Sequence, residues 1–371
     1  MSGGSSWFQR YLLPGLALKA FIIGGGYATG RELAEFFMPA GPQGGLMGML
    51  MAMVIWSVVA VVTFLFARAT DSYDYRSFFK QLLGPGWLVF EITYVLFIVL
   101  ILAVFGAAAG AIVKSTFGWP EIAGTLGLMT AIALVVAFGA TSVERLFKYA
   151  AFFLYGVYAV FLVLSLSTFG DRIALNLSTP APTDGWLEGG LTYAGYNIIG
   201  AVVILPIIRH LTSRKDAVIA GLVAGPLAMI PAIIFFVCMA AYYPEIANEA
   251  LPSGFLLERI GLPAFQIAFQ LMIFIALLET GVGAIHAINE RVSAVYERRR
   301  GRPLSVPIRL AIAAALLIGS IFVADRFGFV ELIAKGYRVI AWVFLAIYIL
   351  PLMTWGVWRL WKGRNAPSAP A

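Results

Sequence analysis

The residues best suited to chemistry lie together in one apolar stretch, residues 20–37. Seven consecutive positions hold four glycines: Gly24, Gly25, Gly26 and Gly30. Glycine costs roughly 1 kcal/mol relative to alanine inside a helix, so this cluster favours an opened backbone. Charged residues follow at once: Arg31, Glu32 and Glu35. Because a charge at the bilayer centre costs about 2.5–3.5 kcal/mol, and an opened backbone in hydrocarbon must face protein, water or a ligand, we predict half of a buried polar site here.

Two interpretations of this stretch remain open. In the first, Gly24–Gly30 lines a binding site for a solute, together with the side chains of Tyr27 and Thr29. In the second, Gly26 and Gly30 are the small residues of a GxxxG helix contact, and the charges lie at the outer water interface. The first interpretation requires a second stretch of the same character elsewhere in the chain.

Residues 191–200 provide such a stretch. The segment Leu191-Thr-Tyr-Ala-Gly-Tyr-Asn-Ile-Ile-Gly200 is rich in small residues and polar in its middle, and its Tyr-Ala pair repeats Tyr27-Ala28. It begins about 167 residues after the first stretch, the length of a five-helix unit. We predict that four of its residues line the solute site: Tyr193, Gly195, Tyr196 and Asn197. An ordinary helix with a small-residue packing face is the alternative.

A third polar group lies in the apolar segment 262–290. Glu279 is about seventeen residues from the start of that segment, too deep for its carboxylate to reach water. Ionised, it needs a cation, a basic partner or strong hydrogen-bond donors, and otherwise it stays protonated. Thr280 and His286 lie along the same side of the helix, and such a line suits a proton relay or a hard cation. We predict an ion site made of these three side chains and the carbonyls near Ile23 and Gly26.

Simpler roles for these polar groups stay open. Glu279 could form a structural ion pair with Lys19 or Lys148, and His286 could serve only in helix packing. At the outer end of the site, Arg31 could act as a gate by pairing with Glu331. However, Glu331 and Lys335 have i,i+4 spacing and can pair along one helix.

Membrane-spanning helices must position these groups. Hydrophobic residues make up 61% and charged residues 12% of the 371 residues, and apolar runs of about 18 residues or more recur along the chain. This composition excludes a soluble globular protein. We predict an all-α integral membrane protein with ten transmembrane helices, at about 11–37, 44–69, 86–114, 120–139, 146–169, 186–208, 217–243, 262–290, 308–324 and 329–359.

The basic residues predict the orientation of these helices. Most of the 26 Lys and Arg residues fall on one side of the predicted bundle, and the loops of the other side carry only Lys114, Arg172, Arg259 and Arg326. Cytoplasmic loops are the ones enriched in Lys and Arg. We therefore predict that both termini are cytoplasmic, and the net charge of +7 needs no nucleic-acid partner.

The ten predicted helices divide into two repeats, about 11–169 and about 186–359. Since five is an odd number, the second repeat inserts with the opposite orientation. Interrupted helices at corresponding positions of such halves mark the central site of a transporter. We predict one transmembrane domain over 1–371, a 5+5 inverted repeat with helices 1 and 6 interrupted, and a disordered tail at 362–371.

A family resemblance extends these expectations. The string Gly24-Gly-Gly-Tyr-Ala-Thr-Gly-Arg-Glu32, followed by Glu35-Phe-Phe37, resembles the first-helix signature of the YkvI-like bacterial membrane proteins, and Thr280–Arg291 is also similar to them. Those proteins are described as amino-acid permeases and resemble the amino acid–polyamine–cation superfamily. The resemblance implies a LeuT-like fold, alternating access around a midplane site, a sodium or proton site between helices 1 and 8, and a bacterial inner membrane. Glu279 departs from the neutral hydroxyls typical of that ion site, which leaves the coupling ion open.

Together these patterns predict a secondary transporter, such as a symporter, that couples Na⁺ or H⁺ to an amino acid or related small polar solute. Half-helix N-termini beside each break suit a carboxylate. A membrane sensor that binds its solute without transport is the alternative. The sequence has no nucleophile elbow, H-E-x-x-H pair or phosphate loop, and two histidines and one cysteine do not favour a metal site. We therefore expect no enzyme activity, no cofactor beyond the coupling ion, and the solute and the lipid bilayer as partners; the sequence leaves the oligomeric state open.

Overall fold

The computed structural model describes residues 6–22, 25–137, 140–301 and 304–364. Helices and loops make up this part of the chain, and no strand occurs in it. Seven of its helical segments are long and apolar enough to cross a membrane: Met38–Ala69, Tyr75–Phe117, Phe153–Ser178, Arg214–Ala240, Pro263–Glu297, Val306–Phe327 and Phe329–Lys362. The predicted all-α membrane protein is confirmed. Ten spans are not reached by this criterion, since the interrupted segments are too short and Glu121–Ala137 is just below the length.

The helices of the first half are α1 (Trp7–Tyr11), α2 (Leu13–Ile22), α3 (Gly25–Thr29), α4 (Arg31–Phe36), α5 (Gly41–Ala69), α6 (Tyr75–Leu83), α7 (Trp87–Phe117), α8 (Glu121–Ala137) and α9 (Ala140–Ser178). Those of the second half are α10 (Trp186–Asn197), α11 (Gly200–Val203), α12 (Arg214–Ala240), α13 (Pro252–Ile260), α14 (Pro263–Arg300), α15 (Val306–Phe327), α16 (Phe329–Glu331), α17 (Arg338–Phe344) and α18 (Val357–Arg364). Single 3₁₀ turns add η1 (Met38–Ala40), η2 (Gly84–Gly86), η3 (Ile207–His210) and η4 (Glu245–Asn248), and π-helical stretches join α16 to α18: η5 (Leu332–Tyr337), η6 (Leu345–Ile349) and η7 (Leu352–Gly356).

Both glycine-rich stretches are interrupted as the sequence predicts. In the first, α2 ends at Ile22 and α3 begins at Gly25; the predicted residues Ile23 and Gly24 lie outside the described residues. Within the described residues, the first stretch breaks at Gly30, whose φ of +82° favours glycine. In the second stretch, α10 ends at Asn197 and only the four-residue α11 follows before the next turn. At both breaks the regular backbone hydrogen bonding of the helix is interrupted, and polar side chains are clustered at these places.

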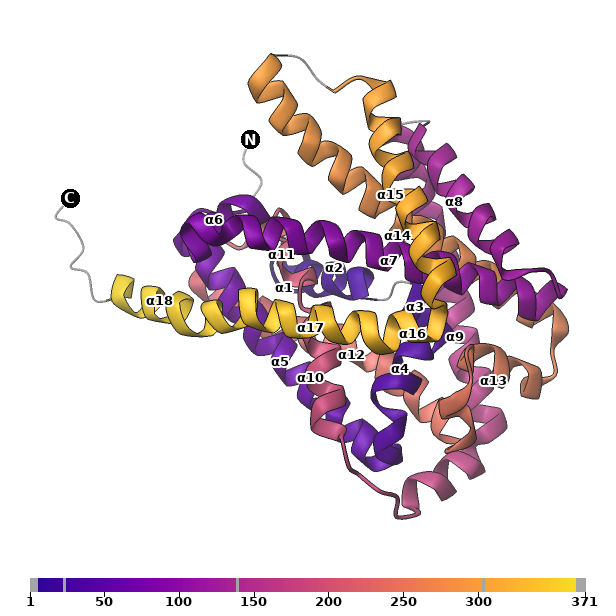
Figure 1. The fold of residues 1–371 in the computed structure, drawn as a ribbon. Helices are drawn as coiled ribbons and strands as arrows, with labels where there is room; N and C mark the ends of the chain where they lie inside the picture. The colour runs from indigo at the N-terminus through magenta and orange to yellow at the C-terminus, as the bar shows by residue number, and fades with distance from the viewer. Residues whose placement is uncertain (1–5, 23–24, 138–139, 302–303, 365–371) are drawn as a thin grey trace.

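The long helices pack around these two broken segments. Helix α12 packs against α5 and α2, and α5 also packs against α10. Helix α7 contacts α8 and α15, and α14 contacts α8 and α9. In Figure 1, α7 runs alongside the C-terminal helices α16 and α17, which it contacts. The broken segments therefore pack against the long helices of the bundle.

The contact between α12 and α5 depends on glycine. A Cβ atom at Gly225 would lie 2.4 Å from the carbonyl oxygen of Met53 and 2.2 Å from Oγ of Ser57. One at Gly221 would lie 2.6 Å from the Val61 backbone. These backbone atoms cannot rotate away, so the pair confirms a small-xxx-small helix contact.

Replacing Gly225 with alanine should lower the free energy of unfolding by about 1–3 kcal/mol, the usual cost of overpacking. Gly319 in α15 is the matched control, because a Cβ atom there meets no atom within 4 Å. Gly319→Ala should instead raise stability by about 0.5–1 kcal/mol, through lower entropy of the unfolded chain. Thermal unfolding of the two purified variants checks both signs. Equal effects would contradict a tight α5–α12 contact.

Several helix boundaries differ from the predictions; α9, for example, ends at Ser178 and not near residue 169. Helix α6 occupies the loop between the second and third predicted spans and was not predicted; Asp74 caps it by accepting a hydrogen bond from the Ser77 backbone N–H at 2.9 Å. Helix α14 continues to Arg300, ten residues past its predicted end. The prediction followed the apolar run only, whereas the last turns of the helix are polar. The expected tail at 362–371 is wrong for its first residues, since α18 reaches Arg364; residues 365–371 lie outside the described part.

Candidate functional site

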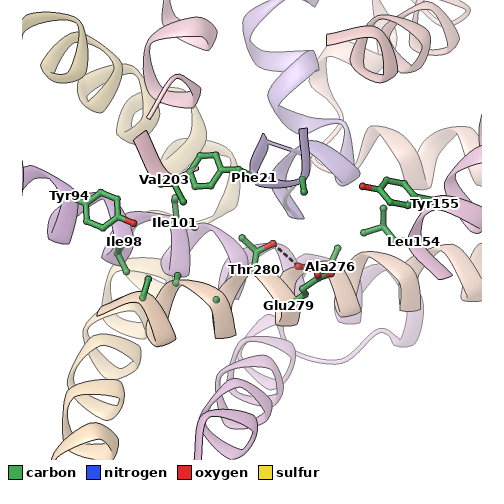
Figure 2. Close-up of a pocket in the computed structure, with 14 residues that line it drawn as sticks. Phe21, Tyr94, Ile98, Ile101, Leu154, Tyr155, Val203, Ala276, Glu279 and Thr280 are labelled. Atoms are coloured by element: carbon green, nitrogen blue, oxygen red, sulfur yellow. Dashed lines mark hydrogen bonds between the residues drawn. The ribbon is translucent and has the colours of Figure 1, made fainter. Parts of the chain in front are cut away.

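A cavity of about 350 Å³ lies among α2, α7, α9, α11 and α14 (Figure 2). Most of its wall is apolar, with Phe21, Ile98 and Leu154 among the larger side chains. Its polar lining consists of Tyr94, Tyr155, Glu279 and Thr280. The structure therefore brings the predicted ion residues Glu279 and Thr280 to the wall of a cavity, as Figure 2 shows.

Glu279 has no basic partner in the described part of the chain, where no Lys or Arg nitrogen lies within 4 Å of its carboxylate. The Lys19 ammonium lies 4.4 Å from the ring centre of Tyr155 instead. The alternative ion pair with Lys19 is thus not formed, and the Lys148 side chain lies outside the described part. A carboxylate in this position is open to a proton or a metal cation.

His286 does not share this wall. The neighbouring lining residues of α14 are Gly283, Ala284 and Ala287, and the half-buried imidazole lies outside that set. The predicted line of three polar groups is therefore reduced to two at the cavity. The Thr280 hydroxyl donates to the Ala276 carbonyl at 2.9 Å, as is usual inside a helix.

A second hollow, about 40 Å³ in volume, adjoins this cavity and shares the lining residues Phe21, Ile101 and Thr280. Glu32 from the first broken segment and Tyr196 from the second meet there: the Tyr196 hydroxyl donates to Oε2 of Glu32 at 2.5 Å. Both side chains are buried. The two interrupted stretches are therefore joined directly, as the prediction of two facing half-sites requires.

Two more side chains complete this hollow. Asn197 lines it, and its side-chain amide donates to the Tyr193 carbonyl at 3.1 Å. Tyr337, from the π-helical stretch η5, stacks on Tyr196 with 4.5 Å between ring centres. Tyr196 and Asn197 were predicted to line the site, and both do line this hollow.

Glu32 and Tyr337 were missed as site residues. Glu32 stands in the first turn after the break at Gly30, which was a usable signal, because a charge so near an opened backbone must have a partner. Tyr337 lies 141 positions after Tyr196, and no local pattern connects the two. Only the fold brings their rings together.

The predicted solute residues Tyr27, Thr29, Gly30, Tyr193 and Gly195 are not among the described lining residues of either cavity. The Tyr27 hydroxyl lies 3.0 Å from that of Tyr158, and Tyr193 packs edge-on against Phe37. A Cβ atom at Gly195 would lie 3.1 Å from that of Ala341. Tyr27, Tyr193 and Gly195 therefore pack against other helices. Thr29 and Gly30 are buried, and Gly25 and Gly26 begin α3.

Arg31 contacts the segment before α13 instead of Glu331. Its guanidinium donates to the carbonyls of Ala247 at 2.9 Å and Glu249 at 2.8 Å, and it forms an ion pair with Glu35. Glu331 forms its ion pair with Lys335. Among the described contacts, the gate pair between Arg31 and Glu331 is thus absent in this conformation, because each side chain has a nearer partner.

Replacing Arg31 with glutamine should loosen the outer segment 245–260, because two hydrogen bonds from a charged donor are lost, worth about 1.5–3 kcal/mol each. Amide hydrogen exchange in η4 and α13 should accelerate at least about tenfold. Lys335→Gln is the control, since Lys335 is 76% exposed in its side chain and contacts no part of that loop. Unchanged exchange in Arg31→Gln would show that the loop is held by other contacts.

The comparisons with known proteins agree with this architecture. No family model matches the chain. The uncharacterized membrane protein YkvI of Bacillus subtilis (strain 168) is 20% identical over 333 residues, which cover 88% of this chain and 90% of that protein. The resemblance to YkvI that the first-helix string predicts is thereby confirmed as a similarity of nearly the whole chain.

Three solved structures share the fold. MhsT in complex with L-phenylalanine has a TM-score of 0.62 and 17% identity, over 97% of this chain and 95% of MhsT. A manganese transporter of Eremococcus coleocola has a TM-score of 0.55 and 16% identity, over 95% and 81%. An inward-facing conformation of Mhp1 has a TM-score of 0.52 and 16% identity, over 91% and 76%. The chain is therefore a membrane protein with the LeuT-like fold that the resemblance implies.

Proposed function

We propose that this protein is a secondary transporter, and not an enzyme, that moves a small polar solute by alternating access. The observation that carries the proposal is the meeting of two interrupted segments at Glu32 and Tyr196, beside a cavity that contains an unpaired carboxylate, Glu279. Opened helices and buried charges are costly in lipid and are kept where a solute or ion passes.

The helix contacts support an inverted repeat of five plus five helices. Helix α2 packs on α12, and its counterpart α10 packs on α5. Likewise α7 packs on α15, and its counterpart α14 packs on α8. Each contact thus recurs with the halves exchanged, which is the expectation for two repeats related by a two-fold axis. On the same proposal, the ten-helix chain lies in a bacterial inner membrane with both termini in the cytoplasm.

An amino acid or related compound fits the cavity better than a metal ion does. The solved relatives include one with bound L-phenylalanine and one named as a manganese transporter, so the fold accommodates both kinds of cargo. A metal ion as cargo would need several oxygen ligands in addition to those of the coupling cation, whereas the lining of the 350 Å³ cavity is apolar apart from Tyr94, Tyr155, Glu279 and Thr280. Glu279 and Thr280 would hold the coupling cation, Na⁺ or H⁺, and the rest of the cavity the solute.

Uptake into sealed proteoliposomes tests the proposal. The purified chain is reconstituted, labelled amino acids are added outside, and a sodium gradient, a pH gradient or neither is imposed at a fixed potential. One net charge moving inward at 100 mV supplies about 2.3 kcal/mol, enough for roughly 50-fold accumulation. Accumulation with one gradient identifies the coupling ion. Saturable binding without any accumulation would overturn the proposal and favour a sensor.

A further inference from the structure

The charges that line the two adjoining cavities have one sign. Glu32 lines the 40 Å³ hollow and Glu279 lines the 350 Å³ cavity. No lysine, arginine or histidine is among the described lining residues of either. A solute recognised mainly through a carboxylate would find two like charges here and no basic side chain to pair with.

Glu32 is the carboxylate with the greater need of a cation. It is 5% exposed, and among the described residues its one hydrogen-bond donor is the Tyr196 hydroxyl. The adjacent Arg31 is occupied by Glu35 and by two carbonyls of the outer loop. A carboxylate has about four acceptor positions, and among the described residues the Tyr196 hydroxyl pairs with one of those on Glu32.

We propose that Glu32 binds the protonated amine of the transported solute, so that the site selects its cargo by an ammonium group rather than by a carboxylate. This inference rests on the transport function proposed above. The hollow of 40 Å³ exceeds the roughly 10–15 Å³ that a group the size of a water molecule needs. An ammonium group has that size and three donors.

The remaining contacts suit the same group. The side-chain nitrogen of Asn197 donates to the Tyr193 carbonyl, and the side-chain oxygen of Asn197 can accept a hydrogen bond from an ammonium. The stacked rings of Tyr196 and Tyr337 line the hollow and can add cation–π attraction. The apolar 350 Å³ cavity next to them receives the body of the solute.

The outer surface near this segment has the matching charge. A cavity of about 590 Å³ is lined by four glutamates and two basic residues: Glu121, Glu245, Glu249, Glu258, Lys114 and Arg259. The Glu249 carbonyl is one of the two that accept from Arg31, which is next to Glu32 in the chain. An excess of negative charge raises the local concentration of cations, which favours a positively charged solute.

Matched ligands test the inference on the wild-type protein. Leucine, its decarboxylated form 3-methylbutylamine and its deaminated form 4-methylpentanoate are titrated into the purified full chain and followed by calorimetry; phenylalanine, phenethylamine and 3-phenylpropionate form a second set. We expect the amino acids and the amines to bind and the acids to show no binding at millimolar concentration. Binding of an acid without its amine, or of no amine in either set, would overturn the inference.

Variants test the residue. Glu32→Gln keeps the side-chain shape and should weaken amine binding about 100-fold or more, because a buried ammonium loses its counter-charge. Tyr196→Phe removes one neutral donor and should change it by about tenfold at most. Glu290→Gln, at a side chain that is 51% exposed, is the matched control and should bind like the wild type. Unchanged amine binding in Glu32→Gln would overturn the inference even if uptake were lost.

The two proposals fail separately. If amines bind through Glu32 but nothing accumulates in proteoliposomes, transport is refuted and the amine site stands. If a solute without an amine is accumulated and Glu32→Gln binds it normally, transport stands and the amine site is refuted.

Discussion

Glu279→Gln should abolish cation-driven accumulation of the solute while leaving solute binding measurable. The carboxylate lines the cavity without a basic partner in the described chain, so its charge or its proton is available to a coupling ion. An amide of the same shape can neither release a proton nor neutralise a cation. The expected result is about a 100-fold loss of gradient-driven uptake, the scale of an uncompensated buried charge, with exchange of labelled for unlabelled solute retained.

Stability distinguishes this role from a structural one. If Glu279 is free to bind an ion, Glu279→Gln removes an unpaired, half-buried charge and should unfold at the wild-type temperature or above. If instead it pairs with Lys148, the variant should lose about 3–5 kcal/mol of stability. Glu290→Gln on the same helix is again the control. Wild-type accumulation in Glu279→Gln would contradict the coupling role, whatever the unfolding temperature.

The sequence was sufficient to predict the breaks and the depth of the polar groups. Clustered glycines at Gly24–Gly30 and the small residues around Gly195 are local features, and the cost of each acts locally on the helix. Glu279 was found for a similar reason, since its distance from both ends of an apolar run can be counted along the chain. Predictions of this kind depend on no distant partner.

The composition of the site depends on distant partners and was predicted only in part. Tyr27 and Tyr193 have the same amphipathic side chain as Tyr196, yet they pack against Tyr158 and Phe37 while Tyr196 reaches Glu32. Tyr193 and Tyr196 are less than one helical turn apart, and only Tyr196 faces the hollow. The ends of helices are not predicted from sequence to that accuracy, so the sequence could not distinguish the two rings. Tyr337 joins from η5 through the fold alone.

The same limit applies to ion pairs. Arg31 and Glu331 are both charged and both near the outer ends of their helices, which makes a gate between them reasonable from sequence. In the structure each is satisfied within one helical turn, Arg31 by Glu35 and Glu331 by Lys335. Local i,i+4 pairs form at little entropic cost, so they take precedence over a partner on another segment in this conformation.

The second large effect is expected at Arg291, where three helices meet at one end of the solute cavity. Its guanidinium lies 2.8 Å from the Glu91 carboxylate and 4.0 and 4.7 Å from the ring centres of Tyr75 and Tyr94. Neither of its Nη atoms has a well-aligned hydrogen bond, so the contact is an ion pair supported by two rings. The cluster joins α6 and α14 to α7, and Tyr94 also lines the cavity.

Arg291→Met keeps much of the apolar stem and removes the charge. It should lower the free energy of unfolding by about 2 kcal/mol, the lower end for a buried pair, because the Glu91 side chain keeps 32% exposure and can be partly hydrated. Glu91→Leu should cost a similar amount. The double variant should recover about 1–2 kcal/mol relative to the sum, as expected when neither charge is left alone.

The double-mutant cycle is measured by unfolding the four proteins in mixed micelles. The Lys114–Glu121 pair is the matched control, since its side chains are 64% and 52% exposed and exposed pairs contribute about 0.2–1 kcal/mol. A coupling at Arg291–Glu91 no larger than in that control would mean that solvent screens the pair. A larger coupling would mean that the ion pair contributes to holding α14 against α7.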